Sequence, residues 1–139
     1  MTVYLSRRYG FAASHRLHSP ALSEARNREI YGKCNNPNGH GHNYEVELTV
    51  RSAVDPVTGL AVDLATLDGL AETHILKPFR YRNLNEEIDV FRLAVPTTEN
   101  MAAEVDRRLR AAWPETFPAD GPRLEKVRIW ETERNICEV

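Results

Sequence analysis

The sequence predicts an α+β fold: an antiparallel four-stranded β-sheet with two helices on one face. Three observations lead to this fold. Residues 44–51 alternate between apolar and polar side chains, which is typical of a half-buried strand. Residues 64–75 and 101–112 carry apolar side chains at helical spacing instead. Three predicted strands precede these helices and one follows them, an order that fits an antiparallel sheet covered on one side.

The first strand is expected over residues 3–11, where the apolar side chains share one phase and Arg7 is the exception. Residues 19–27 form a polar connection with room for a short helix. A second strand over residues 43–52 ends at the turn signal Asp55-Pro56-Val57-Thr58-Gly59. Leu60–Asp63 are expected to begin a returning strand.

Capping residues mark where both helices begin. Asp63 can cap the first helix, which Pro78 is expected to end. Thr97 or Thr98 can cap the second helix, which Pro114 is expected to stop. His74 lies on the apolar stripe of the first helix, and we interpret it as a packed or half-exposed residue and not as a ligand.

The last strand is expected over residues 124–131. Glu131 is in phase with Val127 and Ile129, which places it on the buried face. The alternative for Glu131 is a solvent-exposed carboxylate at the end of the strand.

The composition is that of an ordinary soluble protein. The chain has 139 residues, enough for one domain over residues 1–139. A net charge of −2 argues against nucleic acid or a membrane surface as partner, and no apolar run approaches a membrane span. The N-terminus lacks the apolar segment of a signal peptide, and two cysteines 103 positions apart argue against a disulfide framework. We therefore expect a reduced, cytoplasmic protein.

Histidines gather at the ends of two predicted strands. His40 and His42 share the parity of the apolar residues that come after them, so an extended chain would point both imidazoles to one face. His15 is in phase with Phe11 and Ala13. If the two strands pair, these histidines supply the three protein ligands of a catalytic zinc site with one open position. Taken alone, the His-x-His pair is equally compatible with a chance pair in a loop.

Cys34 lies six residues before His40, across a loop whose Asn, Pro and Gly residues can fold it back over a metal. A nearby positive charge favours the thiolate, which makes Cys34 a candidate base. As a fourth ligand it would instead close the site and make it structural. The remaining alternative is a small buried residue. Lys33 and the exposure of the loop favour reactivity.

Two long motifs resemble the 6-pyruvoyl-tetrahydropterin synthase family, which also contains the 6-carboxy-tetrahydropterin synthases. They are Phe11–Leu17 (FAASHRL) and Tyr31–Tyr44 (YGKCNNPNGHGHNY). The likeness covers nearly the whole chain and continues through five shorter motifs: Asp55–Gly59, Lys77–Pro78, Asn83–Leu84, Thr97–Asn100 and Glu131–Thr132. On these residues the protein is identified as a member of the family.

The resemblance implies the tunnelling fold, in which subunits join edge to edge into a barrel and stacked rings form a homohexamer. The family's substrate is 7,8-dihydroneopterin triphosphate, a pterin that loses triphosphate while its side chain tautomerises. Zinc is the implied cofactor, and no external redox cofactor is needed.

The resemblance also implies a role for each matching residue. The implied metal ligands are His15, His40 and His42, the implied catalytic base is Cys34, and the implied substrate-binding residues are Glu131, Thr97 and Thr98. A carboxylate suits the pterin anchor because it can accept two N–H bonds from the 2-aminopyrimidinone edge.

One pair of positions departs from the family pattern. After Lys-Pro the family carries an Asp-His pair that relays protons with the cysteine, and the ungapped alignment places Arg80 and Tyr81 there. Arginine cannot act as a base at neutral pH, and tyrosine, with a pKa of about 10, is a poor proton shuttle. Arg80 and Arg82 are alternatively candidates to favour the thiolate or to hold a phosphate.

Three functions therefore stay open. The first is a 6-pyruvoyl-tetrahydropterin synthase-type lyase, which the long spacing between Cys34 and His40 favours. The second is a 6-carboxy-tetrahydropterin synthase-like enzyme of the queuosine route. The third is a pterin-binding homologue with impaired or altered catalysis.

Overall fold

The computed structural model describes all residues, 1–139, and contains one antiparallel sheet of four strands. The strands pair in chain order: β1 (Thr2–His15), β2 (His40–Ala53), β3 (Arg123–Trp130) and β4 (Ile136–Glu138). The predicted α+β class with a four-stranded antiparallel sheet is confirmed.

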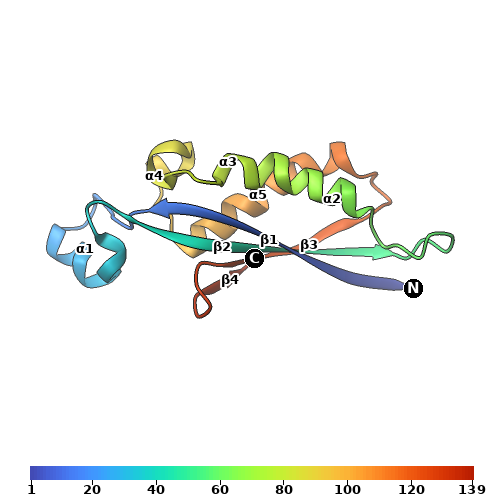
Figure 1. Ribbon diagram of the computed structural model, residues 1–139, viewed down its shortest axis with the longest axis horizontal. Helices are drawn as coiled ribbons and strands as arrows, with labels where there is room; N and C mark the ends of the chain where they lie inside the picture. The colour runs from blue at the N-terminus through green and yellow to red at the C-terminus, as the bar shows by residue number, and fades with distance from the viewer.

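Two long helical segments cover one face of the sheet (Figure 1). The first is built from α2 (Leu64–Ala71), a π-helical turn (Glu72–Leu76) and α3 (Lys77–Phe79). The second is α5 (Thr98–Thr116). No helix combines the length and the apolar character that crossing a membrane requires.

Shorter helical elements lie near the end of the sheet where β1 stops and β2 begins (Figure 1). They are α1 (Glu24–Tyr31), a 3-10 turn (Gly32–Asn35), α4 (Leu84–Glu87) and a second 3-10 turn (Asp89–Arg92). Helix α1 starts within the connection for which a short helix was expected and continues four residues beyond it.

The core lies between the sheet and the two long helical segments, and 24 buried apolar residues form one cluster there. The alternation predicted for the second strand marks the inner face, because Val46, Leu48 and Val50 are all buried. Helix α5 packs Met101 and Leu109 against them.

Arg7 has a partner on the helical layer, which explains why it breaks the apolar phase of β1. Its guanidinium donates to both carboxylate oxygens of Asp68 on α2, at 2.6 and 2.9 Å. The Tyr9 hydroxyl donates to the same carboxylate at 2.8 Å. The pair ties the edge strand to α2 at the margin of the core.

The predicted returning strand at Leu60–Asp63 is wrong. Asp55 does form a turn, since its side chain accepts the N–H groups of Val57 and Thr58 at 2.8 Å each. The chain then enters α2 instead of a strand, and Leu60 is 52% exposed. The fourth strand is β4, whose three residues are too few to show an alternating pattern.

Both predicted caps are confirmed, because Asp63 accepts from Ala65 N and Thr97 accepts from Asn100 N, each at 3.2 Å. Both proline stops are displaced by one or two residues, to Phe79 and Thr116. Proline removes only its own N–H, so residues after it can still donate to carbonyls that precede it.

A loop pairs with the outer edge of β1 close to His15. Tyr81 N–H donates to Ala12 O at 2.7 Å, and Ser14 N–H donates to Arg82 O at 2.9 Å. Ser14 and Asn83 form a parallel bridge. The segment after α3 is thereby fixed beside the end of β1.

Gly39 connects the 3-10 turn to β2 under two constraints. Its φ is +70°, in the left-handed region, and a Cβ at this position would lie 2.8 Å from the His15 carbonyl oxygen. Gly59 has a similar φ of +72°, but nothing lies within 4 Å of its Cβ position. A strained backbone conformation is therefore common to both glycines, whereas a close contact with neighbouring backbone occurs only at Gly39.

We expect Gly39→Ala to destabilise the protein more than Gly59→Ala. Both substitutions force alanine into the left-handed region, which costs roughly 1–2 kcal/mol. Only at position 39 must the His15 backbone also shift, so the loss there should be larger by about 1 kcal/mol or more. Urea denaturation at matched protein concentrations measures both free energies of unfolding. Equal losses would show that the loop yields without disturbing His15.

Candidate functional site

The pairing of β1 with β2 brings three histidines together. His15 lies directly opposite His40 in the register, and Ala13 lies opposite His42. His15, His40 and His42 therefore occupy one face at the same end of the sheet. His15 is 1% exposed, whereas the other two are half-buried.

The imidazole nitrogens converge in a way that suits a metal ion. His40 Nε2 lies 3.1 Å from His15 Nε2 and 3.1 Å from His42 Nε2. Nitrogens bound to one tetrahedral metal at about 2.0–2.1 Å would be roughly 3.3 Å apart, close to these distances. A single hydrogen on His40 Nε2 can satisfy only one of the two contacts. The arrangement fits three lone pairs directed at a shared cation.

The surroundings of His15 favour the tautomer of its ring that can bind a metal through Nε2. Its Nδ1 lies 3.1 Å from the Pro96 carbonyl oxygen, which can only accept, so Nδ1 carries the hydrogen and Nε2 keeps its lone pair. The Tyr44 hydroxyl is 3.0 Å from the same Nδ1. Burial lowers the pKa of His15 to about 4 and also lowers the pKa of His42. Both rings are therefore neutral at neutral pH, as metal ligation requires.

Cys34 lies beside the histidines, in the 3-10 turn that precedes β2. Its Sγ and one nitrogen from each of the three histidines lie within 4.8 Å of one another. The turn is held against the segment after β1, because Leu17 N–H donates to Cys34 O at 2.7 Å and Asn35 Nδ2 donates to Leu17 O at 2.8 Å. Burial, and then the negative charge of Glu131, raise the pKa of the Cys34 thiol.

Glu131 is a buried carboxylate with one oxygen available. It is 6% exposed, and its Oε2 accepts from the Thr98 hydroxyl at 2.9 Å. Asn135 donates in turn to that hydroxyl at 3.0 Å. Oε1 lies 3.6 Å from His42 Nε2, beyond hydrogen-bond distance. A buried carboxylate without a cation is costly, so this oxygen favours a ligand that donates N–H bonds.

The remaining predicted site residue has a structural task. The Thr97 hydroxyl accepts the N–H of Asn100 and begins α5. Thr98, the next residue, reaches Glu131. The structure therefore joins Thr98 to Glu131 and places Thr97 at the start of the helix that carries Thr98.

Arg80 and Tyr81 come directly after α3. The guanidinium of Arg80 donates to both carboxylate oxygens of Glu72 at 3.0 and 2.8 Å. Tyr81 has a φ of +60° and is 81% exposed. It lines a cavity of about 340 Å³ that also includes His42. Arg80 is thus paired with Glu72 on the preceding π-helical turn, whereas the Tyr81 side chain is exposed to solvent.

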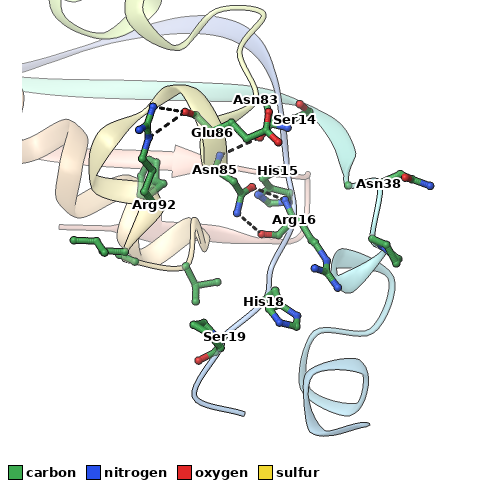
Figure 2. Close-up of a pocket in the computed structure, with 17 residues that line it drawn as sticks. Ser14, His15, Arg16, His18, Ser19, Asn38, Asn83, Asn85, Glu86 and Arg92 are labelled. Atoms are coloured by element: carbon green, nitrogen blue, oxygen red, sulfur yellow. Dashed lines mark hydrogen bonds between the residues drawn. The ribbon is translucent and has the colours of Figure 1, made fainter. Parts of the chain in front are cut away.

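A cavity at this end of the sheet includes His15 but does not reach Glu131. It measures about 870 Å³ and is lined by His15, Arg16 and the α4 region, including Asn85 and Arg92, but by neither Cys34 nor Glu131 (Figure 2). Ten of its 17 lining residues have polar side chains. The size of this cavity therefore does not by itself identify the site formed by the histidines, Cys34 and Glu131.

Sequence reasoning missed three groups that orient the site: Tyr44, the Pro96 carbonyl and Asn135. Tyr44 comes two residues after His42 and so shares its face of the strand, which could have indicated a contact with the histidines. The same pattern, however, is equally typical of an apolar strand residue. The other two contacts join segments distant in sequence, so no local pattern reveals them.

Comparisons with known proteins agree with this geometry. A family model described as 6-pyruvoyl tetrahydropterin synthase matches residues 4–139. The 6-pyruvoyl tetrahydrobiopterin synthase of Poecilia reticulata is 44% identical over 133 residues, covering 96% of this chain and 86% of the relative. The Homo sapiens enzyme of the same name is 43% identical over 132 residues, covering 95% and 87%.

The solved structure of Caenorhabditis elegans 6-pyruvoyl tetrahydropterin synthase superposes with a TM-score of 0.88 at 39% identity. It covers 100% of this chain and 95% of its own. The sequence match and the shared architecture extend over the same residues, so the chain belongs to the 6-pyruvoyl tetrahydropterin synthase family.

Proposed function

We propose that the protein is a zinc-dependent lyase that eliminates triphosphate from 7,8-dihydroneopterin triphosphate. The convergence of three imidazole nitrogens beside the Cys34 thiol carries this proposal. Relatives 43–44% identical over nearly the whole chain are named 6-pyruvoyl tetrahydrobiopterin synthases, which supports the same reaction class.

In this proposal His15, His40 and His42 hold zinc, whose charge when bound stabilises negative charge that develops on the substrate side chain. Oε1 of Glu131 accepts from the N–H edge of the pterin, while Thr98 holds Oε2 in place. Cys34 moves a proton on the side chain. Burial opposes the thiolate by raising the thiol pKa, whereas a cation among the histidines favours it.

One observation favours a second candidate, a pterin-binding homologue with impaired turnover. Arg80 occupies the position of the family's aspartate and is paired with Glu72, so it offers no base. Tyr81 is the only other titratable group at the two relay positions. The binding residues do not depend on this pair.

For the assembly we propose a cytoplasmic homohexamer whose sheets join edge to edge. Strand β4 pairs with only the last three residues of β3, and the loop at Tyr81 covers only the site end of β1. Most of the outer edge of β1 and the first part of β3 thus keep unpaired backbone groups, which a neighbouring subunit can satisfy.

A turnover assay tests the proposed function. Zinc-loaded protein is incubated with 7,8-dihydroneopterin triphosphate, and triphosphate release and product mass are measured over time. Release with formation of 6-pyruvoyl-tetrahydropterin supports the lyase. A 6-carboxy-tetrahydropterin product would support the alternative enzyme, and substrate binding without release would support the pterin-binding candidate.

The metal prediction concerns the three converging histidines. Purified protein should contain about one zinc per chain, and His15→Ala, His40→Ala and His42→Ala should each lower that content, because a three-ligand site loses a third of its donors. His74→Ala, a half-buried histidine outside the cluster, is the matched control. If elemental analysis found the full zinc content in all three variants, the proposed zinc site would be wrong.

The anchor prediction concerns Glu131. Glu131→Gln keeps the shape but removes the charge and replaces one acceptor oxygen by a donor, so pterin affinity should fall by roughly 1.5–3 kcal/mol. Titration with 7,8-dihydroneopterin, which lacks phosphates, isolates this contact. Exposed Glu133→Gln serves as the control. Unchanged affinity in the Glu131 variant would place the pterin elsewhere.

The relay prediction concerns Arg80 and Tyr81. A general acid–base group is worth typically about 10²–10⁴-fold in rate, so wild-type turnover should lie below that of a complete family member by that order. Arg80→Asp with Tyr81→His should raise product formation. Because the new aspartate would face Glu72, the same pair combined with Glu72→Gln should raise it further.

The matched control for this restoration is Glu72→Gln alone, which disrupts the ion pair without supplying a base. Wild-type turnover as fast as that of a complete family member would contradict the prediction. A loss of that turnover in Tyr81→Phe would then assign the proton transfer to Tyr81.

A further inference from the structure

A separate cavity of about 510 Å³ lies between the segment that comes after β1 and helix α1. Five of its lining side chains are basic or can become so: Arg16, His18, Arg28, Lys33 and His40. Glu24 is the only carboxylate there, and Pro37 is the only lining residue with an apolar side chain. We refer to this cavity as the basic cleft.

The Arg and Lys side chains of the basic cleft form no ion pair within the protein. Most Lys and Arg side chains of the molecule pair with a carboxylate, among them Arg26, on the same helix as Arg28, with Glu29 at 2.9 Å. Arg16, Arg28 and Lys33 have no such partner. Like charges gathered in one cleft raise each other's free energy until an anion lies between them. The cleft is therefore built to attract negative charge.

Two of the basic groups are oriented by one buried residue, Asn35. Arg16 Nε donates to the Asn35 carbonyl at 3.2 Å, which fixes the guanidinium beside the cleft. Asn35 Nδ2 lies 3.0 Å from His18 Nδ1 and must be the donor, so the neutral His18 ring carries its hydrogen on Nε2. Figure 2 shows Arg16 and His18 on the segment after β1. Both can present N–H groups to an anion.

The basic cleft adjoins the imidazole group on the side away from Glu131. His40 belongs to that group and also lines the cleft. His42, at the other end of the group, lies 3.6 Å from Glu131. The order along the site is carboxylate, imidazoles, basic cleft. A ligand with an N–H-rich ring at one end and a polyphosphate at the other, joined by a short hydroxylated chain, matches this order.

We propose that the basic cleft binds the polyphosphate of the substrate, with Arg28 and Lys33 as the main electrostatic contacts and Arg16 and His18 as oriented donors. The identity of the ligand rests on the proposed function; the affinity for polyphosphate rests on the cleft alone. Lys33 precedes Cys34, so the leaving group would be held beside the residue that moves the proton.

Inorganic triphosphate is a probe that tests the polyphosphate affinity of the basic cleft separately from the identity of the substrate. Calorimetric titration of the zinc-loaded protein should detect binding that weakens with ionic strength. Arg28→Gln and Lys33→Gln should each weaken binding roughly 10-fold, because each removes a charge-assisted contact. Arg26→Gln, which changes the same charge on α1 outside the cleft, is the matched control and should bind like wild type. Affinity for phosphate-free 7,8-dihydroneopterin should stay unchanged in Arg28→Gln.

Steady-state assays extend the test to the substrate, for which Arg28→Gln should raise KM roughly 10-fold. Triphosphate binding that depends on Arg28 and Lys33 without any turnover would keep the basic cleft and reject the proposed function. Turnover with no triphosphate binding, or with equal binding in all variants, would keep the function and overturn the cleft. If triphosphate binds at the metal instead, His15→Ala alone should weaken its binding, and this result would also contradict the proposed role of the basic cleft.

Discussion

The register between β1 and β2 is the constraint on which the candidate site depends. Side chains alternate between the two faces of a strand, so a shift by one residue would turn His15 away from His40. The core sets this register: Phe11 lies opposite Tyr44, and their rings stack at 5.2 Å in the buried layer. The packing that stabilises the sheet and the alignment of the imidazoles are therefore one and the same requirement.

The start of α5 orients the site from the other side. Pro96, just before the helix, fixes the ring of His15 through its carbonyl, and Thr98, in the first turn, holds one oxygen of Glu131. One short segment thus fixes a candidate metal ligand and the candidate anchor together. Two side-chain contacts hold this segment at the beginning of the helix: the Thr97 hydroxyl accepts from Asn100 N, and Asn100 Nδ2 donates to Val95 O at 2.7 Å.

The Arg80 position shows how a side chain can change while the backbone keeps its path. Arg80 is neutralised by Glu72 within the same helical region, so its charge does not require a partner in the site. The next residue is held to β1 through its backbone N–H, which does not depend on the side chain. Arg80 and Tyr81 are thus accommodated at these positions by contacts that keep the local fold. The basic cleft, by contrast, is formed by a different loop and is independent of that change.

Local patterns in the sequence were enough to predict the strands around Tyr44 and Val127 and both helix caps. They also predicted that His15, His40 and His42 share one face of the sheet. Each of these features depends on the spacing of residues along one segment. The returning strand at Leu60 was wrong and β4 was missed, since a turn signal does not determine the type of the next element and three residues carry no periodicity. Only the tertiary structure decided which distant segments meet: the Pro96 carbonyl on His15, the Thr98–Asn135 support of Glu131, the Arg7–Asp68 tie and the pairing of Arg80 with Glu72. Such contacts depend on how the layers pack, and packing is settled by the whole chain at once rather than by any stretch of it.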